Sequence, residues 1–335
     1  MKKRLYLLSI LLLMVFVAAC SDSESNNEKN DDGVEETEES DFPEKSIEIV
    51  VPYESGTTDT LARLIAEYAE PHLPKDQPIV IDNRPGGNAA VGTEKVFNSE
   101  PDGYTLLFSG YSTTVIRPHV DDEINFTHDS FQSIANFTKV PQILVTKKDG
   151  KWDSAEELIE DVKNADEPIL IGSTGFGGFQ HVMIEKLNEE LGGNLEIVQF
   201  SGSSEVAQAV LGGSVDLSIA GVPNLLGNDD YQPLATVSPE RSELLDDIPT
   251  LKELDIDVEG DLMFGLWGPK DMDESVLNIL EEAFAEAAQD SEVIDELNDM
   301  GYESSYENAK DFQNTIDNAY EDFGNIIDEL NLLEE

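Results

Sequence analysis

The sequence contains a single cysteine, four histidines and only 20 lysines and arginines among its 335 residues. One cysteine excludes a disulfide framework and a metal cluster built on several thiolates. The histidines show no metal-ligand spacing such as i, i+4; they are His72, His119, His128 and His181. The 71 acidic residues bring the formal charge to −51. With so few bases, nothing can neutralise a run of phosphates, which excludes a nucleic-acid binder.

Motifs of nucleophilic catalysis are also missing. The chain has no Gly-x-Ser-x-Gly elbow and no credible combination of Ser, His and Asp. An enzymatic activity is therefore not expected, and no motif calls for a cofactor or a metal ion.

The N-terminus is typical of an exported protein. Residues 1–4 are basic after the first methionine, and residues 5–19 are apolar except for Ser9, which predicts a signal peptide over 1–19. The lone Cys20 follows Val-Ala-Ala and resembles the lipobox cysteine of bacterial lipoproteins; the alternative is a stray or buried cysteine. We expect lipidation of Cys20 and anchoring to the outer face of the cytoplasmic membrane.

Acidic residues dominate two further segments. Residues 21–41 hold ten acids and one base, which predicts a disordered, lipid-bearing tether over 20–41. The last 65 residues hold 21 acids and one base, Lys310, without EF-hand spacing. We interpret these acids as solvated helix faces, better tolerated in a salty environment because salt shortens the range of their repulsion.

Strands and helices alternate through the rest of the chain, which predicts α/β lobes with mostly parallel sheets. Two similar units stand about 120 residues apart, each a strand, a Gly/Ser-rich loop and a helix. Their loops, at 54–58 and 172–178, favour an anion site at helix N-termini, with simple turn chemistry as the alternative. Thr58 or Asp59 is expected to cap the first helix. The predicted strands are 47–51, 79–81, 104–108, 169–171, 195–199, 215–220 and 258–266, and the predicted helices include 88–97 and 203–212.

An ordered set of motifs resembles the tripartite tricarboxylate transporter receptors, the TctC or Bug family. The resemblance covers about residues 42–330. Its motifs are Ile47-Glu-Ile-Val-Val-Pro-Tyr53, Gly56-Thr-Thr-Asp59, Val80-Ile-Asp-Asn-Arg-Pro-Gly-Gly87, Pro101-Asp-Gly-Tyr-Thr-Leu-Leu107, Arg117-Pro-His119, Gly172-Ser-Thr-Gly175 with His181, Leu211-Gly-Gly-Ser-Val-Asp-Leu217 and Asp247-Ile-Pro-Thr250.

The resemblance implies an α/β, two-lobed periplasmic-binding-protein type II fold of the Venus flytrap kind. It implies one lobe from 42–141 plus 262–335 and a second from 142–261. It also implies a receptor for a small mono-, di- or tricarboxylate that works with a large and a small integral membrane subunit. The alternatives are a receptor of the same fold that acts on a sensor kinase, and an extracellular hydrolase.

The resemblance also implies ligand-binding residues, held to the carboxylate by backbone N–H groups and hydroxyls. On the first lobe they are Tyr53, Ser55, Gly56, Thr57, Thr58 and Asp59, with Ser109, Tyr111, Ser112 and Thr113 as a variable part. On the second lobe they are Ser173, Thr174, Gly175, Phe176, Gly177, His181, Phe200 and Gly202. The acidic Glu54, and Ser201 where a lysine is common, depart from the family pattern and leave the ligand's identity open.

Overall fold

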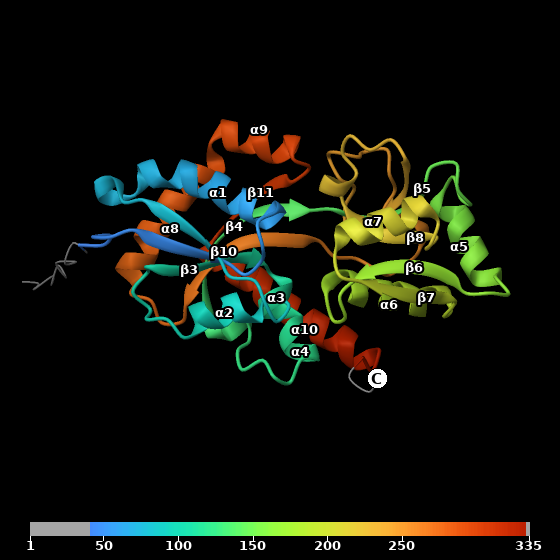
Figure 1. Ribbon diagram of the computed structural model, residues 1–335, viewed down its shortest axis with the longest axis horizontal. Coiled ribbons are helices and arrows are strands. Elements are labelled where there is room, and N and C mark those ends of the chain that lie inside the picture. The colour runs from blue at the N-terminus through green and yellow to red at the C-terminus, as the bar shows by residue number, and fades with distance from the viewer. Residues whose placement is uncertain (1–40, 333–335) are drawn as a thin grey trace, which may run out of the picture. The chain divides into compact units, whose positions relative to one another are not determined.

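The computed structural model describes residues 41–332, which belong to one compact unit, Ser40–Glu335. The predicted signal peptide, Cys20 and all of the predicted tether except Asp41 lie outside the described residues. The unit contains two mixed sheets flanked by helices, so the predicted two-lobed α/β fold is confirmed. Figure 1 shows the two groups of strands side by side, joined through β4 and β5.

The first lobe is built on a six-stranded sheet of order β11-β4-β10-β3-β1-β2. Its strands are β1 (Ile47–Val51), β2 (Ile79–Asn83), β3 (Thr105–Gly110), β4 (Phe131–Val140), β10 (Leu262–Pro269) and β11 (Glu303–Asn308). Its helices are α1 (Thr57–Ala69), α2 (Ala90–Phe97), α3 (Ser112–Val115), α4 (Arg117–Val120), α8 (Glu274–Gln289), α9 (Ser291–Asp299) and α10 (Ala309–Glu329), with 3-10 turns at Glu70–His72, Pro74–Asp76 and His128–Ser130.

The second lobe is built on a five-stranded sheet of order β7-β6-β8-β5-β9. Its strands are β5 (Gln142–Lys147), β6 (Ile169–Thr174), β7 (Leu195–Phe200), β8 (Leu217–Gly221) and β9 (Tyr231–Thr236). Its helices are α5 (Ala155–Asn164), α6 (Phe179–Leu191) and α7 (Ser203–Gly212), with 3-10 turns at Val222–Asn224 and Lys252–Leu254.

The chain passes between the sheets twice. Pro141 separates β4 of the first sheet from β5 of the second, and the chain returns between β9 and β10, reaching the first sheet after Asp261. The strands that flank these passages run against their neighbours: β10 is antiparallel to β3 and β4, and β5 is antiparallel to β8 and β9. The prediction of mostly parallel sheets is therefore wrong, because each passage feeds its strand into the sheet from the opposite end.

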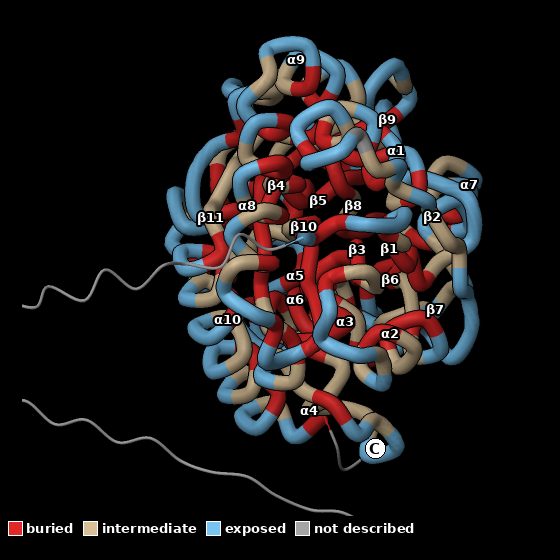
Figure 2. The backbone as a smooth tube through the Cα atoms, turned by 90° about the vertical axis from the view of Figure 1, so that its left-hand side faces the viewer, coloured by how far each residue is buried: buried red, intermediate tan, exposed pale blue. Residues whose placement is uncertain are grey.

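Apolar side chains from both lobes form the core. The helix predicted after the first Gly/Ser-rich loop is α1, which buries its apolar stripe of Leu61, Leu64 and Ile65 against the first sheet. One large apolar cluster includes Val50 and Phe323 of the first lobe together with Phe179 of the second. In Figure 2 the buried residues follow the central strands, while the outer helical turns are exposed.

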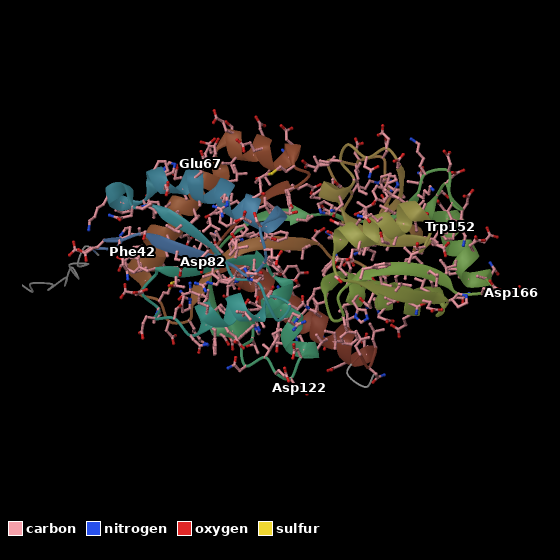
Figure 3. The ribbon with its side chains drawn as sticks, in the orientation of Figure 1. Phe42, Glu67, Asp82, Asp122, Trp152 and Asp166 are labelled. Carbon is pink, nitrogen blue, oxygen red and sulfur yellow. The ribbon has the colours of Figure 1, made fainter. Side chains whose placement is uncertain are left out.

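The acidic side chains lie mostly outside this core. Glu67, Asp122 and Asp166 are exposed and point away from the ribbon in Figure 3. Most of the described carboxylates thus stay solvated, which avoids the large cost of burying an unpaired charge.

Candidate functional site

The loop after β1 leads directly into α1. Gly56 is the N-cap of α1, its carbonyl accepts hydrogen bonds from the backbone N–H and hydroxyl of Thr60, and no side chain caps the helix. The expectation that Thr58 or Asp59 caps this helix is therefore wrong, because the helix already begins at Thr57 and both residues lie inside its first turn. The first N–H groups of a helix have no acceptor within it, so this end remains a donor of hydrogen bonds.

Asp59 is held in an ion pair rather than left for a ligand. Its carboxylate is 5% exposed, lies 2.9 Å from the Arg63 guanidinium and accepts a hydrogen bond from the Ser55 hydroxyl at 3.0 Å. Burial raises the pKa of Asp59, but the hydrogen bonds from Arg63 and Ser55 outweigh burial and hold that pKa below its ordinary value. Asp59 and Ser55 therefore shape the loop, and Arg63 is already neutralised.

The hydroxyls of Thr57 and Tyr53 are also engaged within the first lobe. Tyr302 is buried and its hydroxyl hydrogen-bonds with the Thr57 side chain; burial raises the pKa of Tyr302 to about 12. The Tyr53 hydroxyl lies 3.1 Å from the Thr113 hydroxyl, which in turn lies 3.0 Å from that of the fully buried Ser109. The structure thus brings Tyr53, Ser109 and Thr113 together in one hydrogen-bonded series.

Tyr111 has a different place from the one expected. Its ring is buried against Phe323 of α10 at a centroid distance of 6.0 Å, and its hydroxyl donates to the Asp261 carbonyl at 2.9 Å. Burial raises the pKa of Tyr111 well above its ordinary value. In this conformation Tyr111 supports the returning chain segment, and its neighbour Ser112 starts the short helix α3.

The loop after β6 depends on glycines. Ser173 and Thr174 lie in the strand itself, and the chain then turns through Gly175 and Gly177, whose φ angles of +65° and +68° strongly favour glycine. The Gly175 N–H donates to the Phe200 carbonyl at 3.3 Å, which joins this loop to the end of β7. The Ser173 hydroxyl is buried and has no hydrogen-bond partner among residues 41–332.

His181 and Phe176 lie side by side and line a pocket that contains none of the other predicted ligand-binding residues. The buried His181 accepts a hydrogen bond at Nδ1 from the Gly177 N–H, its Nε2 lies 3.7 Å from the Glu185 carboxylate, and its ring lies 4.7 Å from that of Phe176. Both residues line a pocket of about 440 Å³ beside β7. In this conformation His181 fixes the loop, a role consistent with its burial inside α6.

Thr174 lines a small hollow between α7 and the ends of β6 and β8. The hollow measures about 20 Å³, room for roughly one water molecule. Gly202 is the N-cap of α7, and no side chain caps this helix, while Phe200 is partly buried against the core. Sequence reasoning missed four further polar residues of this hollow, because isolated Gln, Asn and Ser residues give no distinctive signal: Gln180, Ser203, Ser218 and Asn224.

Two glycines of the predicted second-lobe loop lie close to first-lobe residues across the lobe boundary. Gly175 lies near the Asn88 amide, and Gly177 lies against Val120 of α4. Arg117 of the Arg117-Pro-His119 motif forms an ion pair with Asp121.

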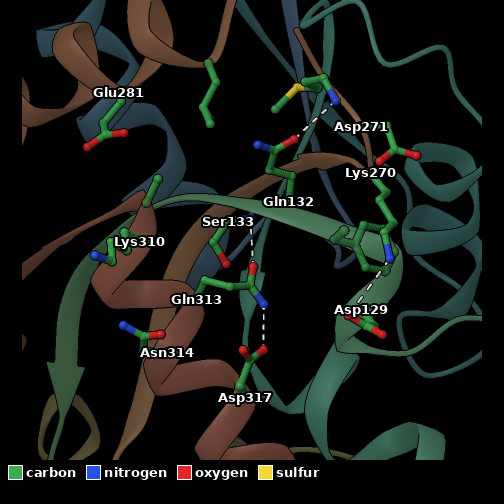
Figure 4. A pocket seen from close by; sticks show the side chains of 14 residues that line it. Asp129, Gln132, Ser133, Lys270, Asp271, Glu281, Lys310, Gln313, Asn314 and Asp317 are labelled. Carbon is green, nitrogen blue, oxygen red and sulfur yellow. Dashed lines mark hydrogen bonds and ion pairs between the residues drawn. The ribbon is translucent and has the colours of Figure 1, made fainter. Parts of the chain in front are cut away.

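A larger pocket of about 670 Å³ lies in the first lobe and contains none of the predicted ligand-binding residues. Figure 4 shows Lys270, Lys310, Gln132 and Gln313 around it, with Asp129 and Asp317. Among the described residues no cluster of His, Cys, Asp and Glu is suited to hold a metal ion. No helix within residues 41–332 is long and apolar enough to cross a membrane.

Comparison with known proteins identifies the family. The sequence model of the tripartite tricarboxylate transporter family receptor, TctC, matches residues 61–332. The chain belongs to the TctC family. TctC relatives include the UPF0065 protein in the gbd 5′ region of Cupriavidus necator, 29% identical over 81% of this chain and 83% of that protein. Protein BugT of Bordetella pertussis is 27% identical over 76% of this chain and 79% of its own length.

A solved structure supports the same fold. The R. palustris protein Rpa4515, determined with adipate, has a TM-score of 0.77 to this chain at 24% identity. The match covers 87% of this chain and 99% of that one. This chain of the TctC family thus shares its fold with Rpa4515 across nearly the whole of that protein's length.

Proposed function

We propose that this TctC protein is an extracytoplasmic receptor that binds a small carboxylate and delivers it to the two integral membrane subunits of a tripartite tricarboxylate transporter. The carrying observation is that α1 and α7 begin at glycine N-caps without side-chain caps, one in each lobe. Such helix ends offer backbone donors and a partial positive charge to a carboxylate.

The arginine side chains near these loops are already paired with aspartates and are not free to bind a carboxylate. Arg63 is paired with Asp59, and Arg117 is paired with Asp121. A carboxylate is therefore met by neutral hydroxyls and N–H groups, among them the Ser203 hydroxyl. A structural neighbour that holds adipate supports a ligand of this class.

Binding and release require the second-lobe site to open. The hollow beside Thr174 has room for only about one water molecule, too little for an organic acid. We infer that ligand enters when the lobes or the loops around 175 and 203 move apart, and that the observed conformation is the closed limit of that motion.

The proposal is tested by calorimetry on the purified protein with mono-, di- and tricarboxylates. One acid should bind at one site per chain, without turnover. Ser203→Asp should weaken that binding at least tenfold, because the added carboxylate repels the ligand while an acid in the first helical turn preserves α7. Ser204→Asp, one residue further along and outside the hollow, is the matched control and should bind normally. Binding of no acid, or equal loss in both variants, would contradict the proposal.

We also propose that Cys20, outside the described residues, is the lipidated N-terminus of the mature protein. The basic start, apolar run and small residues before Cys20 support it. Cell fractionation of Cys20→Ser should show release from the membrane fraction. Unchanged membrane retention of a processed Cys20→Ser protein would refute it.

A further inference from the structure

Three hydrogen-bonded side chains connect the first passage between the lobes, at Pro141, to the hollow in the second lobe. The Gln142 amide nitrogen donates to the Val140 carbonyl at 3.0 Å, and the Gln142 amide oxygen accepts from the Gln180 amide nitrogen at 3.4 Å. The Gln180 amide oxygen then accepts from the Thr174 hydroxyl at 3.1 Å. Gln142 is the first residue after Pro141 and is only 1% exposed.

The direction of this chain is set at its buried end. A backbone carbonyl can only accept, so Gln142 must turn its NH₂ group toward Val140 and its oxygen toward Gln180. Gln180 must then present its own NH₂ group to Gln142, which leaves its oxygen facing Thr174. Thr174 has one proton to donate, and Gln180 takes it.

Turning either glutamine amide around would place an acceptor against an acceptor and a donor against a donor. A turned Gln142 would place its oxygen against the Val140 carbonyl and its NH₂ group against the NH₂ group of Gln180. Because Gln142 is buried, both groups would lack a partner and no water could replace it. Gly221 also packs close to the Gln142 amide nitrogen, which restricts the side chain further.

We propose that this relay makes Thr174 an obligate hydrogen-bond acceptor toward the ligand, and that the receptor therefore selects carboxylates bearing a hydroxyl or amino group. The inference rests on the proposed function and specifies its ligand class. The Thr174 hydroxyl has already donated its proton to Gln180, so toward the hollow it can only accept a hydrogen bond. A carboxylate oxygen gains nothing from such an acceptor, whereas a ligand hydroxyl or ammonium group donates to it.

Matched acids test the selection by calorimetry. The pairs are malate with succinate, aspartate with succinate, and lactate with propionate. For the pair that the protein binds, the substituted acid should bind about tenfold more tightly, the effect of one satisfied hydrogen bond in a desolvated site. Equal affinity, or preference for the unsubstituted acid, would overturn the proposal.

Two variants separate the relay from simple contact with the ligand. Thr174→Val should abolish the preference and leave the unsubstituted acid's Kd within about twofold. Gln142→Leu, remote from the hollow, should also reduce the preference toward unity, because Gln180 is then free to turn and Thr174 regains its proton. Gln232→Leu on β9 is the matched control, since the Gln232 amide donates to its neighbour Pro233 outside the relay. An unchanged preference in Gln142→Leu would refute the relay.

A measurement without ligand tests the hydrogen-bonded relay separately from the proposed carboxylate binding. In ¹⁵N-labelled protein, the side-chain NH₂ protons of Gln142 should exchange slowly with solvent, and the Gln180 signals should shift in Gln142→Leu but not in Gln232→Leu. Rapid exchange at Gln142 would overturn the relay even if acids bind. If no acid binds, the proposed function and the ligand class both fail, and this measurement still decides the orientation of the amides.

Discussion

Gly177 of the second lobe lies directly against the side chain of Val120 in the first lobe. A Cβ at position 177 would overlap the Val120 methyl group, and the φ angle of +68° at Gly177 disfavours any other residue. Gly177→Ala should therefore lower the free energy of unfolding by about 1–3 kcal/mol, through backbone strain and overpacking. Chemical denaturation measures it.

Val120→Ala provides the control for this prediction. Combined with Gly177→Ala it should restore part of the loss, because the smaller side chain relieves the overlap but not the strain at φ. Strict additivity of the two changes would mean that the residues do not touch in solution.

Tyr111 fixes the returning chain segment through its hydroxyl. Tyr111→Phe keeps the ring against Phe323 and removes the hydrogen bond to the Asp261 carbonyl, so the loss of unfolding free energy should be about 1 kcal/mol. Urea denaturation of Tyr111→Phe is compared with that of Tyr306→Phe, a half-buried tyrosine of β11. A stability equal to the unmodified protein would show that the hydroxyl contributes nothing.

His128 should make stability depend on pH. Its ring stacks on Tyr320 at 3.9 Å, and burial lowers its pKa below the ordinary value of 6.5 despite the nearby Asp317 and Asp129. The unfolded chain therefore binds a proton more readily than the folded one. The stability from neutral His128 is full above pH 6.5 and is lost as pH falls from 6.5 toward the lowered pKa.

The test of His128 compares melting temperatures from pH 5 to 7.5. His128→Phe keeps a ring on Tyr320 but cannot titrate, so its melting temperature should fall less than that of the unmodified protein as the solution is acidified. A difference between the two proteins that stays constant with pH would contradict the prediction.

Salt should strengthen carboxylate binding or leave it unchanged. The charge of −51 repels an anion over a Debye length of about 10 Å at 0.1 M salt and about 3 Å at 1 M, while contact hydrogen bonds in a closed site are screened much less. Dissociation constants from 0.1 to 1 M NaCl measure this. A steep loss of affinity would indicate a basic pocket instead.

Helices and strands whose residues carry a local pattern could be predicted from the sequence. Strands whose position depends on pairing with distant segments were missed. The apolar stripe of α1 and the β-rich run of β1 were visible in the residues themselves. β4 and β5 were missed because their direction and pairing depend on the passage at Pro141. The same limit applies to Tyr111, whose aromatic ring and hydroxyl suit a ligand site equally well until Phe323 and Asp261 are seen beside it.

The residues of the candidate site also fall into those that could be predicted from the sequence and those that could not. The glycines at 175 and 177 could be predicted as a turn because glycine adopts that backbone far more readily than other residues. Gln142 could not be predicted, because its importance arises from contacts with Val140 and Gln180 that bring together distant parts of the sequence.

The shared apolar cluster sets the order in which this protein can be completed during synthesis. Phe323 of α10 packs against Phe179 of α6 at 5.9 Å, and α10 follows every strand of both sheets in the sequence. A ribosome therefore produces all eleven described strands before α10, which packs against β4 and β11 of the first lobe and against α6 of the second. Until α10 emerges, the apolar side chains that it covers remain open to water, so the nascent chain should be bound by holding chaperones until late in its synthesis.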